Sequence, residues 1–229
     1  MAAVIVQSAV VNFNSGTFLP TFTMSAPTNG NWLIALGTHW NSGMVASTGW
    51  TLINNTDGSA QDGTCCAYKL CGVGESTSQV PFGASSQGMC ACWEVSGLTG
   101  VWATDFQSTH NNFDLTMANA YITGSYNTVS PNTMVLTLHA GTIATGSTAV
   151  APAVTTGQTD DKTLLDNTSS SRHGGMTASH QLFPASGSAV AYTVTEAVPY
   201  LKGMWVHVAL NWPAPAAAGV IRSIAPSGI

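Results

Sequence analysis

The chain has 229 residues, of which 45% are hydrophobic and only 7% are charged, and its formal net charge is −5. This length allows one large β domain or two small domains with a substantial core. Nucleic-acid binding needs clustered basic side chains, so the scattered ones here exclude it. They are Lys69, Lys162, Arg172, Lys202 and Arg222. The scarcity of charge favours a surface covered in an assembly, or a protein that works outside the cell.

The amino-terminal stretch 1–13 has no charged segment ahead of its apolar run, and that run is shorter than a membrane span. We therefore expect no signal peptide, no membrane partner and synthesis in a cytoplasm. The five cysteines all fall in the first half, at positions 65, 66, 71, 90 and 92. An odd number without a secretion signal argues against a disulfide framework, and the spacing is not that of a zinc site. We expect these thiols to pack as small apolar side chains.

Apolar and polar residues alternate through most of the chain, and no window of a dozen residues has helical periodicity with caps. The clearest alternation lies in 88–98 and 203–212, each with one apolar face. The predicted strands are 4–11, 17–24, 32–40, 64–71, 88–98, 101–107, 133–140, 147–155, 175–183, 189–195 and 203–212. Short strands separated by Gly, Asn, Ser and Pro predict an all-β sandwich or barrel.

Residues 50–70 and 162–182 read nearly alike at a shift of 112 positions. The identical pairs are Thr51/Thr163, Leu52/Leu164, Asn55/Asn167, Thr56/Thr168, Ser59/Ser171, Gly63/Gly175 and Leu70/Leu182. Gly88-Met89 matches Gly203-Met204 at a shift of 115, and 31–40 resembles 132–141 at a shift near 101. In both halves an apolar strand, a T-L-x-x-N-T strand and turn, a Gly-led strand and a Gly-Met strand follow in the same order. This indicates an internal duplication, with pseudo-repeats at about 12–107 and 112–212.

The two halves can interleave into one sandwich, each giving strands to both sheets, or form two domains. No charged or Pro-rich linker separates them near 108–132, so we favour one domain over 1–212, a jelly-roll-like antiparallel β-sandwich. Residues 213–229 are rich in Pro and Ala and predict an extended C-terminal arm. Its apolar residues Val220, Ile221 and Ile224 either bind a neighbouring subunit or belong to a frayed end.

The sequence contains no G-x-S-x-G, H-E-x-x-H or S-x-x-K signature of a hydrolase. Across the repeat, His180 corresponds to Tyr68 and His207 to Cys92, which favours packing positions over ligands. The histidines are at positions 39, 110, 139, 173, 180 and 207. We predict no catalytic residue, no metal site and no cofactor.

The acidic residues lie mostly in turn-like settings, such as Asp57 and Asp62, where a calcium loop is the alternative to a plain turn. Glu94 lies on a buried-looking strand without an evident partner. A glycosidase with two convergent carboxylates is the enzymatic alternative.

The seven tryptophans offer a better functional lead than the titratable residues. Trp32, Trp93 and Trp212 alternate with aliphatic residues and are expected to fill the core. Trp40, Trp50 and Trp102 are candidate platforms for sugar rings. A carbohydrate-binding adhesin is therefore an alternative function.

An ordered set of motifs in the first half points to a family. The motifs are Asn29 to Leu36 (NGNWLIAL), Gly49 to Ile53 (GWTLI), Ala67 to Lys69 (AYK), Gly74 to Ser78 (GESTS) and Trp93 to Leu98 (WEVSGL). This set resembles β-sandwich proteins found among bacteriophage head and tail genes, although Asn31 stands where their pattern usually has Asp. The motifs look like scaffold features, so the resemblance implies a virion component and transfers no functional site.

We therefore expect a non-enzymatic bacteriophage structural protein, made in the host cytoplasm and located in the virion, most simply a capsid decoration or cement protein. The expected partners are the major capsid protein or other virion proteins, and further copies of the chain, with a trimer favoured. A tail or fibre component is the nearest alternative.

Overall fold

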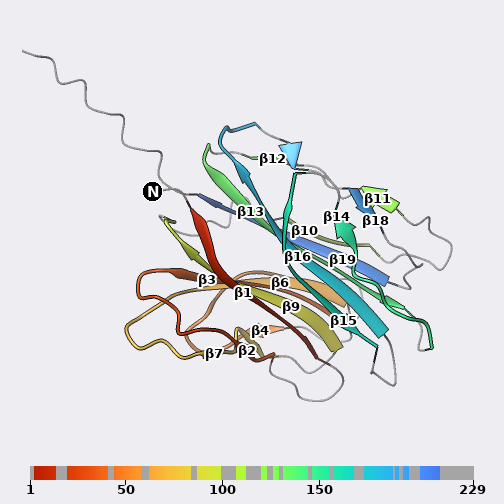
Figure 1. Ribbon diagram of the computed structural model, residues 1–229, viewed down its shortest axis with the longest axis horizontal. Coiled ribbons are helices and arrows are strands. Elements are labelled where there is room, and N and C mark those ends of the chain that lie inside the picture. The colour runs from red at the N-terminus through yellow and green to blue at the C-terminus, as the bar shows by residue number, and fades with distance from the viewer. Residues whose placement is uncertain are drawn as a thin grey trace, which may run out of the picture.

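The computed structural model describes residues 3–13, 20–40, 44–57, 62–83, 87–98, 107–111, 120–122, 126–128, 131–143, 146–154, 157–167, 173–187, 189–190, 193–195 and 202–211. The long strands of the first half are β1 (Val4–Phe13), β3 (Trp32–Trp40), β5 (Thr51–Asp57), β6 (Asp62–Leu70) and β9 (Gln87–Ser96) (Figure 1). Those of the second half are β10 (Gln107–Asn111), β13 (Thr133–Ile143), β15 (Thr159–Asp166), β16 (His173–Phe183) and β19 (Lys202–Asn211). No helix long and apolar enough to cross a membrane occurs in these ranges.

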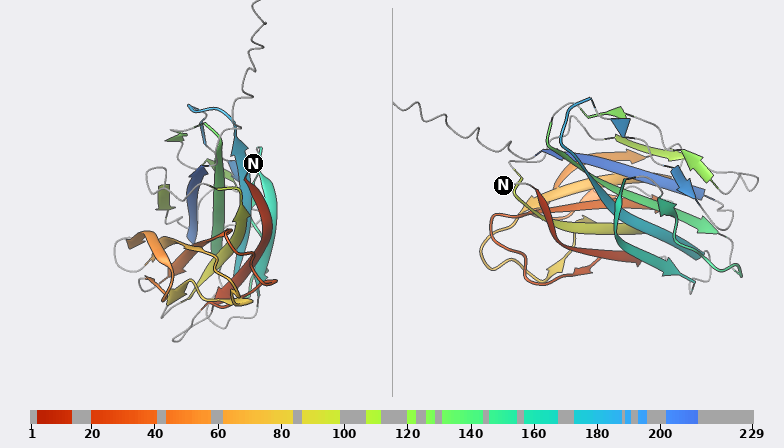
Figure 2. Two further views of the ribbon diagram at one scale, coloured as in Figure 1. Left: turned by 90° about the vertical axis from the view of Figure 1, so that its left-hand side faces the viewer. Right: turned by 45° about the horizontal axis from the view of Figure 1, so that its top comes forward.

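These strands form two five-stranded antiparallel sheets, ordered β1-β9-β3-β6-β5 and β10-β19-β13-β16-β15. The sheets pack face to face in opposite order, with β1 against β15, β3 against β13 and β19, and β6 against β10 and β19 (Figure 2). The predicted all-β antiparallel sandwich is thus confirmed.

Each five-stranded sheet is drawn from one half of the chain. The expected interleaving, in which each half gives strands to both sheets, is not found among the described strands, and the jelly-roll part of the prediction is not confirmed. The alternation of side chains shows which face of a strand is buried. The backbone groups that pair with neighbouring strands lie in the plane of the sheet, so their partners leave no pattern in the sequence. The sequence therefore could not show which sheet each strand joins.

The central strands of the two sheets share one register. Gly37 on β3 lies between Cys65 and Cys90, and His139 on β13 lies between Thr177 and Trp205. These equivalent residues are 102, 112 and 115 positions apart along the chain, close to the shifts read from the sequence. The structural likeness is therefore real in the central strands, while an origin by duplication stays a prediction.

The edge strands β5 and β15 are related by another shift. Leu52 lies opposite Ala67, and Asp160 lies opposite Ser179, so these edge residues are 108 positions apart rather than 112. Each strand has a bulge at the next residue, Ile53 or Asp161. The Thr51/Thr163 and Leu52/Leu164 identities are therefore not structurally equivalent.

Two other predicted strands are much shorter than expected. Of 17–24, the described residues form only β2 (Phe22–Thr23), and of 147–155 they form only β14 (Ala153–Val154). Pro20 and Pro152 lie within these stretches and have no N–H to give to a ladder.

The core between the sheets is built from the inward faces predicted for 88–98 and 203–212. Met89, Ala91, Trp93 and Val95 all belong to it. The second sheet contributes Val206, Val208 and Leu210, together with residues of β13 and β16. Trp93 is fully buried, and burying a side chain of this size dominates core energetics.

The outer face of the first sheet is covered by residues 20–31, 44–50 and 71–83, which we call the outer layer. It contains β2, β4 (Val45–Ala46), β7 (Ser78–Gln79) and β8 (Phe82–Gly83), with pairs β2-β7 and β4-β8. Phe22, Met44 and Phe82 of the layer form a second core with small side chains of the sheet, among them Cys65 and Cys90. All five cysteines are free and buried, as small packing side chains should be.

The outer face of the second sheet is polar, although it is buried as well. Where the first sheet has Ala35, Gly37, Cys65, Ala67 and Cys92, the second has Thr137, His139, Thr177, Ser179 and His207, all at most 1% exposed. Small sheets of the second half accompany it: β11 (Ala120–Ile122), β18 (Thr193–Thr195) and β14, and β12 (Tyr126–Asn127) with β17 (Ala189–Val190). The two five-stranded sheets thus have equivalent strand orders, but the outer face of the first is apolar and that of the second is polar.

Candidate functional site

A cavity of about 550 Å³ opens in the outer layer, and its walls come from residues 45–50, from Lys69 at the end of β6, and from residues 75–83. We call it the outer-layer pocket. Two turns shape it, at Gly49 (φ 85°) and Gly74 (φ 72°), a backbone region that favours glycine. The backbone N–H of Ser47 donates to Pro81 O, so the first turn is tied to the residue that precedes β8.

An ion pair lies in the pocket wall. Lys69 Nζ donates to Glu75 Oε1 at 2.6 Å, and Gln79 Nε2 donates to the same oxygen at 3.2 Å. The Gly72 N–H reaches the other oxygen at 3.4 Å. Burial raises the pKa of Glu75, but these donors, Lys69 first, outweigh it and hold the pKa below its usual value. The carboxylate is thus ionised at neutral pH and cancels the lysine charge.

Several polar atoms of the pocket keep unused hydrogen-bonding capacity. Lys69 has three N–H donors, and within the described ranges only Glu75 accepts from it. No described residue accepts from the indole N–H of Trp50. Gln79 is only 2% exposed, and its amide group also donates to Ser76 O at 2.5 Å. The pocket is therefore held in shape by internal bonds while leaving donors for a ligand.

Trp50 is the one candidate sugar platform whose side chain the structure describes. It is only 8% exposed and packs in the outer-layer core, at the edge of the pocket. Trp50 is therefore a core residue and does not offer the open ring face expected of a sugar platform. The Trp40 side chain, Trp102 and the apolar tail residues Val220, Ile221 and Ile224 lie outside what the structure describes. Of the tryptophans expected in the core, Trp93 is fully buried, Trp32 is partly buried against Tyr68, and Trp212 is not described.

Glu94, which has no evident partner in the sequence, is held by several hydrogen bonds in the structure. Its carboxylate accepts from Gln7 Nε2 at 2.5 Å, from Thr28 N at 2.9 Å and from Asn31 Nδ2 at 2.6 Å. Burial raises its pKa, but the hydrogen bonds from Gln7, Thr28 and Asn31 outweigh it and lower the pKa overall. Asp at position 31 would place a second carboxylate here, whereas Asn donates. Glu94 therefore fastens segment 24–31 of the outer layer to the first sheet.

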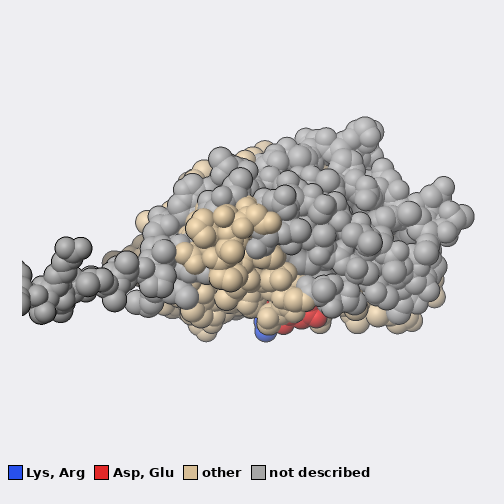
Figure 3. Space-filling model, turned by 90° about the horizontal axis from the view of Figure 1, so that it is seen from above, with Lys and Arg blue, Asp and Glu red and all other residues tan. Residues whose placement is uncertain are grey.

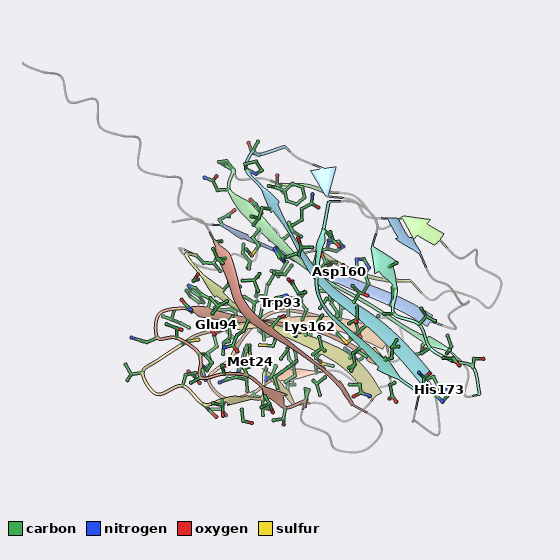
Figure 4. All side chains as sticks on the ribbon, in the orientation of Figure 1. Met24, Trp93, Glu94, Asp160, Lys162 and His173 are labelled. Atoms are coloured by element: carbon green, nitrogen blue, oxygen red, sulfur yellow. The ribbon has the colours of Figure 1, made fainter. Side chains whose placement is uncertain are left out.

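A second acid joins the two sheets. Asp161, the bulge residue of β15, accepts from Trp93 Nε1 at 2.7 Å and lies 2.8 Å from His180 Nδ1. His180 is thus a hydrogen-bonding residue rather than the packing residue expected from the repeat. Asp160, Asp161, Lys162 and Thr163 line a smaller cavity of about 320 Å³. Asp160, Lys162 and Trp93 are labelled in Figure 4. Burial and the charge of Asp161 raise the pKa of Asp160. The bulge lets an edge strand turn one carboxylate inward.

The buried polar face of the second sheet forms its own network. Gln158 donates to Thr137 Oγ1 at 3.1 Å and accepts from Ser179 Oγ at 2.6 Å, and Thr137 Oγ1 lies 3.3 Å from His207 Nδ1. Burial lowers the pKa of His139 to about 3, and burial and His139 lower that of His207 well below its usual value. Both imidazoles are therefore neutral at physiological pH.

The described residues include no group of three or more His, Cys, Asp or Glu side chains that could hold a metal ion. The Asp57–Asp62 loop, a calcium alternative in the sequence, has its residues 58–61 outside the described ranges. Paired carboxylates do occur at Asp160 and Asp161, but Asp161 is engaged by Trp93 and His180.

Comparison of the chain with protein-family models, with curated proteins and with solved structures finds no match. The resemblance to bacteriophage β-sandwich proteins therefore rests on the short motifs of the first half alone.

Proposed function

We propose that this chain is a non-enzymatic structural protein of a bacteriophage virion, most simply a capsid decoration or cement protein, with a tail or fibre component as the alternative. The observation that carries the proposal is that the motif residues behind the resemblance contact one another. Asn31 of the first motif donates to Glu94 of the last, and Lys69 of the third pairs with Glu75 of the fourth.

Other motif positions also serve the scaffold. Gly30, Gly49, Gly74 and Gly97 all have positive φ, between 72° and 85°, where a side chain is strained. Trp50 fills the core under the outer layer. The motifs thus specify a sheet with a covering layer, which supports a family likeness in architecture and a role as a structural part.

The surface offers apolar edges for assembly. Val4 and Val6 on β1 are 53% and 49% exposed, and Leu165 on β15 is 49% exposed. Because β1 and β15 are edge strands that lie against each other, these side chains belong to one edge of the sandwich. In Figure 3 the described surface is mostly uncharged, with acidic and basic side chains at one margin. Edge strands with exposed apolar residues favour pairing with another chain, here the major capsid protein or another copy.

The test is peptide mass spectrometry of purified phage particles from a host that carries the gene. We expect the protein in the particles at a copy number comparable to that of the capsid subunit. Separation of heads from tails then distinguishes decoration from a tail or fibre role. Abundant protein in the lysate with none in purified particles would refute the virion proposal.

A further inference from the structure

We propose that the outer-layer pocket is a binding site for a neutral carbohydrate, contacted by Lys69, Glu75 and Gln79. This goes beyond the virion role and does not depend on it. The proposal rests on three features of the pocket: its charge balance, its mixture of donors and acceptors, and its preformed walls.

The charge balance selects an uncharged ligand. Lys69 and Glu75 are in contact at 2.6 Å, with side chains 23% and 10% exposed. A charged ligand that paired with one member of this couple would be repelled by the other at nearly the same distance, and that repulsion is poorly screened in a partly buried site. A neutral ligand meets no such penalty. The couple therefore disfavours simple anions and cations.

The polar groups suit neighbouring hydroxyls. A sugar hydroxyl both donates and accepts, so one hydroxyl can accept from Lys69 while the next donates to Glu75. Bonds to charged partners are stronger than bonds between neutral groups. Ser47, Ser76 and Ser78, each of which carries a hydroxyl, also border the pocket. The ligand class that fits best is a polyol with adjacent hydroxyls on a rigid ring.

The walls are formed before any ligand arrives. Gln79 is bonded to Ser76 O and Glu75, and the N–H of Ser78 donates to Ser76 Oγ at 3.0 Å. Val45, Ala46 and Val80 give the pocket an apolar side, which suits the C–H groups of a sugar ring. The volume of about 550 Å³ falls within the range of small-molecule sites. Preformed walls reduce the ordering cost of binding.

The experiment is a titration of the ¹⁵N-labelled full-length protein, followed by amide chemical shifts. The probes are methyl glycosides of glucose, galactose, mannose and N-acetylglucosamine, with glycerol, sulfate and putrescine as comparisons. We expect at least one glycoside to give saturable shifts confined to residues 45–50 and 69–83, with Kd below about 10 mM. Glycerol, sulfate and putrescine should give no saturable shifts there.

Two variants and a control locate the site. Lys69→Met keeps the aliphatic chain and removes the ammonium, and we expect affinity to fall at least tenfold. Ser78→Phe adds a ring at an exposed position of the wall, so it blocks the pocket without touching the ion pair and should also abolish binding. Lys162→Met, an exposed lysine on β15, should bind like the unmodified protein. Melting temperatures confirm that each variant is folded.

Three results would overturn the proposal. One is the absence of saturable shifts with all four glycosides, and another is unchanged affinity in a folded Ser78→Phe variant. The third is equal binding of sulfate or putrescine, which would make the pocket an ion site. None of these results bears on whether the protein is found in virions, so the two proposals fail separately.

Discussion

The buried histidines of the second sheet predict a loss of stability in mild acid. His139 and His207 are fully buried, and burial lowers the pKa of His139 to about 3 and that of His207 well below its usual value. In the unfolded chain both groups return to a pKa near 6.5. Below that pH the unfolded state binds more protons than the folded state, so stability is fully present above pH 6.5 and is lost as the pH falls.

The size of the effect follows from the two pKa values. Each proton bound only by the unfolded chain costs about 1.4 kcal/mol per pH unit. Between pH 7 and pH 5 each histidine therefore removes roughly 2 kcal/mol, and the pair roughly 4 kcal/mol. That is a large part of the 5–15 kcal/mol typical of a folded domain. Glu75 and Glu94 have lowered pKa values. The stability that these two carboxylates give the fold is therefore lost only in more acidic solution, and they do not account for a loss between pH 7 and pH 5.

The assay is urea unfolding, followed by tryptophan fluorescence, at several pH values between 8 and 5. We expect the free energy of unfolding to fall steadily in the unmodified protein. In the His139→Gln/His207→Gln variant, the decrease should be smaller by roughly 4 kcal/mol. The reasoning is refuted if both proteins lose the same stability, or if NMR shows these two imidazoles titrating near pH 6.5 in the folded protein.

Three further outcomes are expected. Gly37→Ala should destabilise by about 1–3 kcal/mol, because its Cβ would lie 2.8 Å from Cys65 Sγ and 2.9 Å from Cys90 Sγ. Gly72→Ala, with nothing within 4 Å, is the matched control, and equal urea midpoints for the two would contradict the packing argument. Asn31→Asp should destabilise the folded protein at pH 7 by about 1–3 kcal/mol, because it replaces a donor to Glu94 by a second carboxylate. Much of this loss should be recovered near pH 4, where one of the two carboxyl groups takes up a proton. If urea unfolding shows that the loss of stability in this variant does not depend on pH, the contact between residue 31 and Glu94 is contradicted. Light scattering should show a closed oligomer for the full chain, with a trimer favoured, and a monomer for a chain that ends at Pro213. The same oligomeric state for both chains would exclude an arm that crosses between subunits.

The sequence predicted the inward faces of the central strands well, for a physical reason. Met89, Trp93, Val206 and Val208 alternate with residues on the opposite face because each strand has one face on the shared core. A slip of one residue would invert that pattern, so the register of central strands is strongly specified. The shifts of 112 and 115 seen in the sequence hold there for the same reason.

The edge strands were harder to align. The identity of Thr51 with Thr163 suggested a shift of 112, whereas the register gives 108. An edge strand has a partner on one side only, and its exposed Thr and Leu side chains constrain the register little. The bulge at Asp161, which turns that carboxylate toward Trp93, leaves no signature in the local pattern.

The candidate site was only partly predictable. Trp50 was singled out as an exposed platform; it borders the pocket but is only 8% exposed. The ion pair of Lys69 with Glu75 lies within one short segment and two recognisable motifs, so it was within reach of sequence reasoning. Glu94 was not, because its partners Gln7, Thr28 and Asn31 lie 63 to 87 positions away. Only the folded sheet brings them together.

Because every sheet is drawn from a single half of the chain, no backbone hydrogen-bond ladder joins the halves through the described strands. Side-chain packing and the Trp93–Asp161 bond connect them instead. A polypeptide cut between β9 and β10 would keep each ladder intact. The two fragments, expressed together, should therefore find each other and reconstitute the sandwich, as two subunits of a heterodimer do.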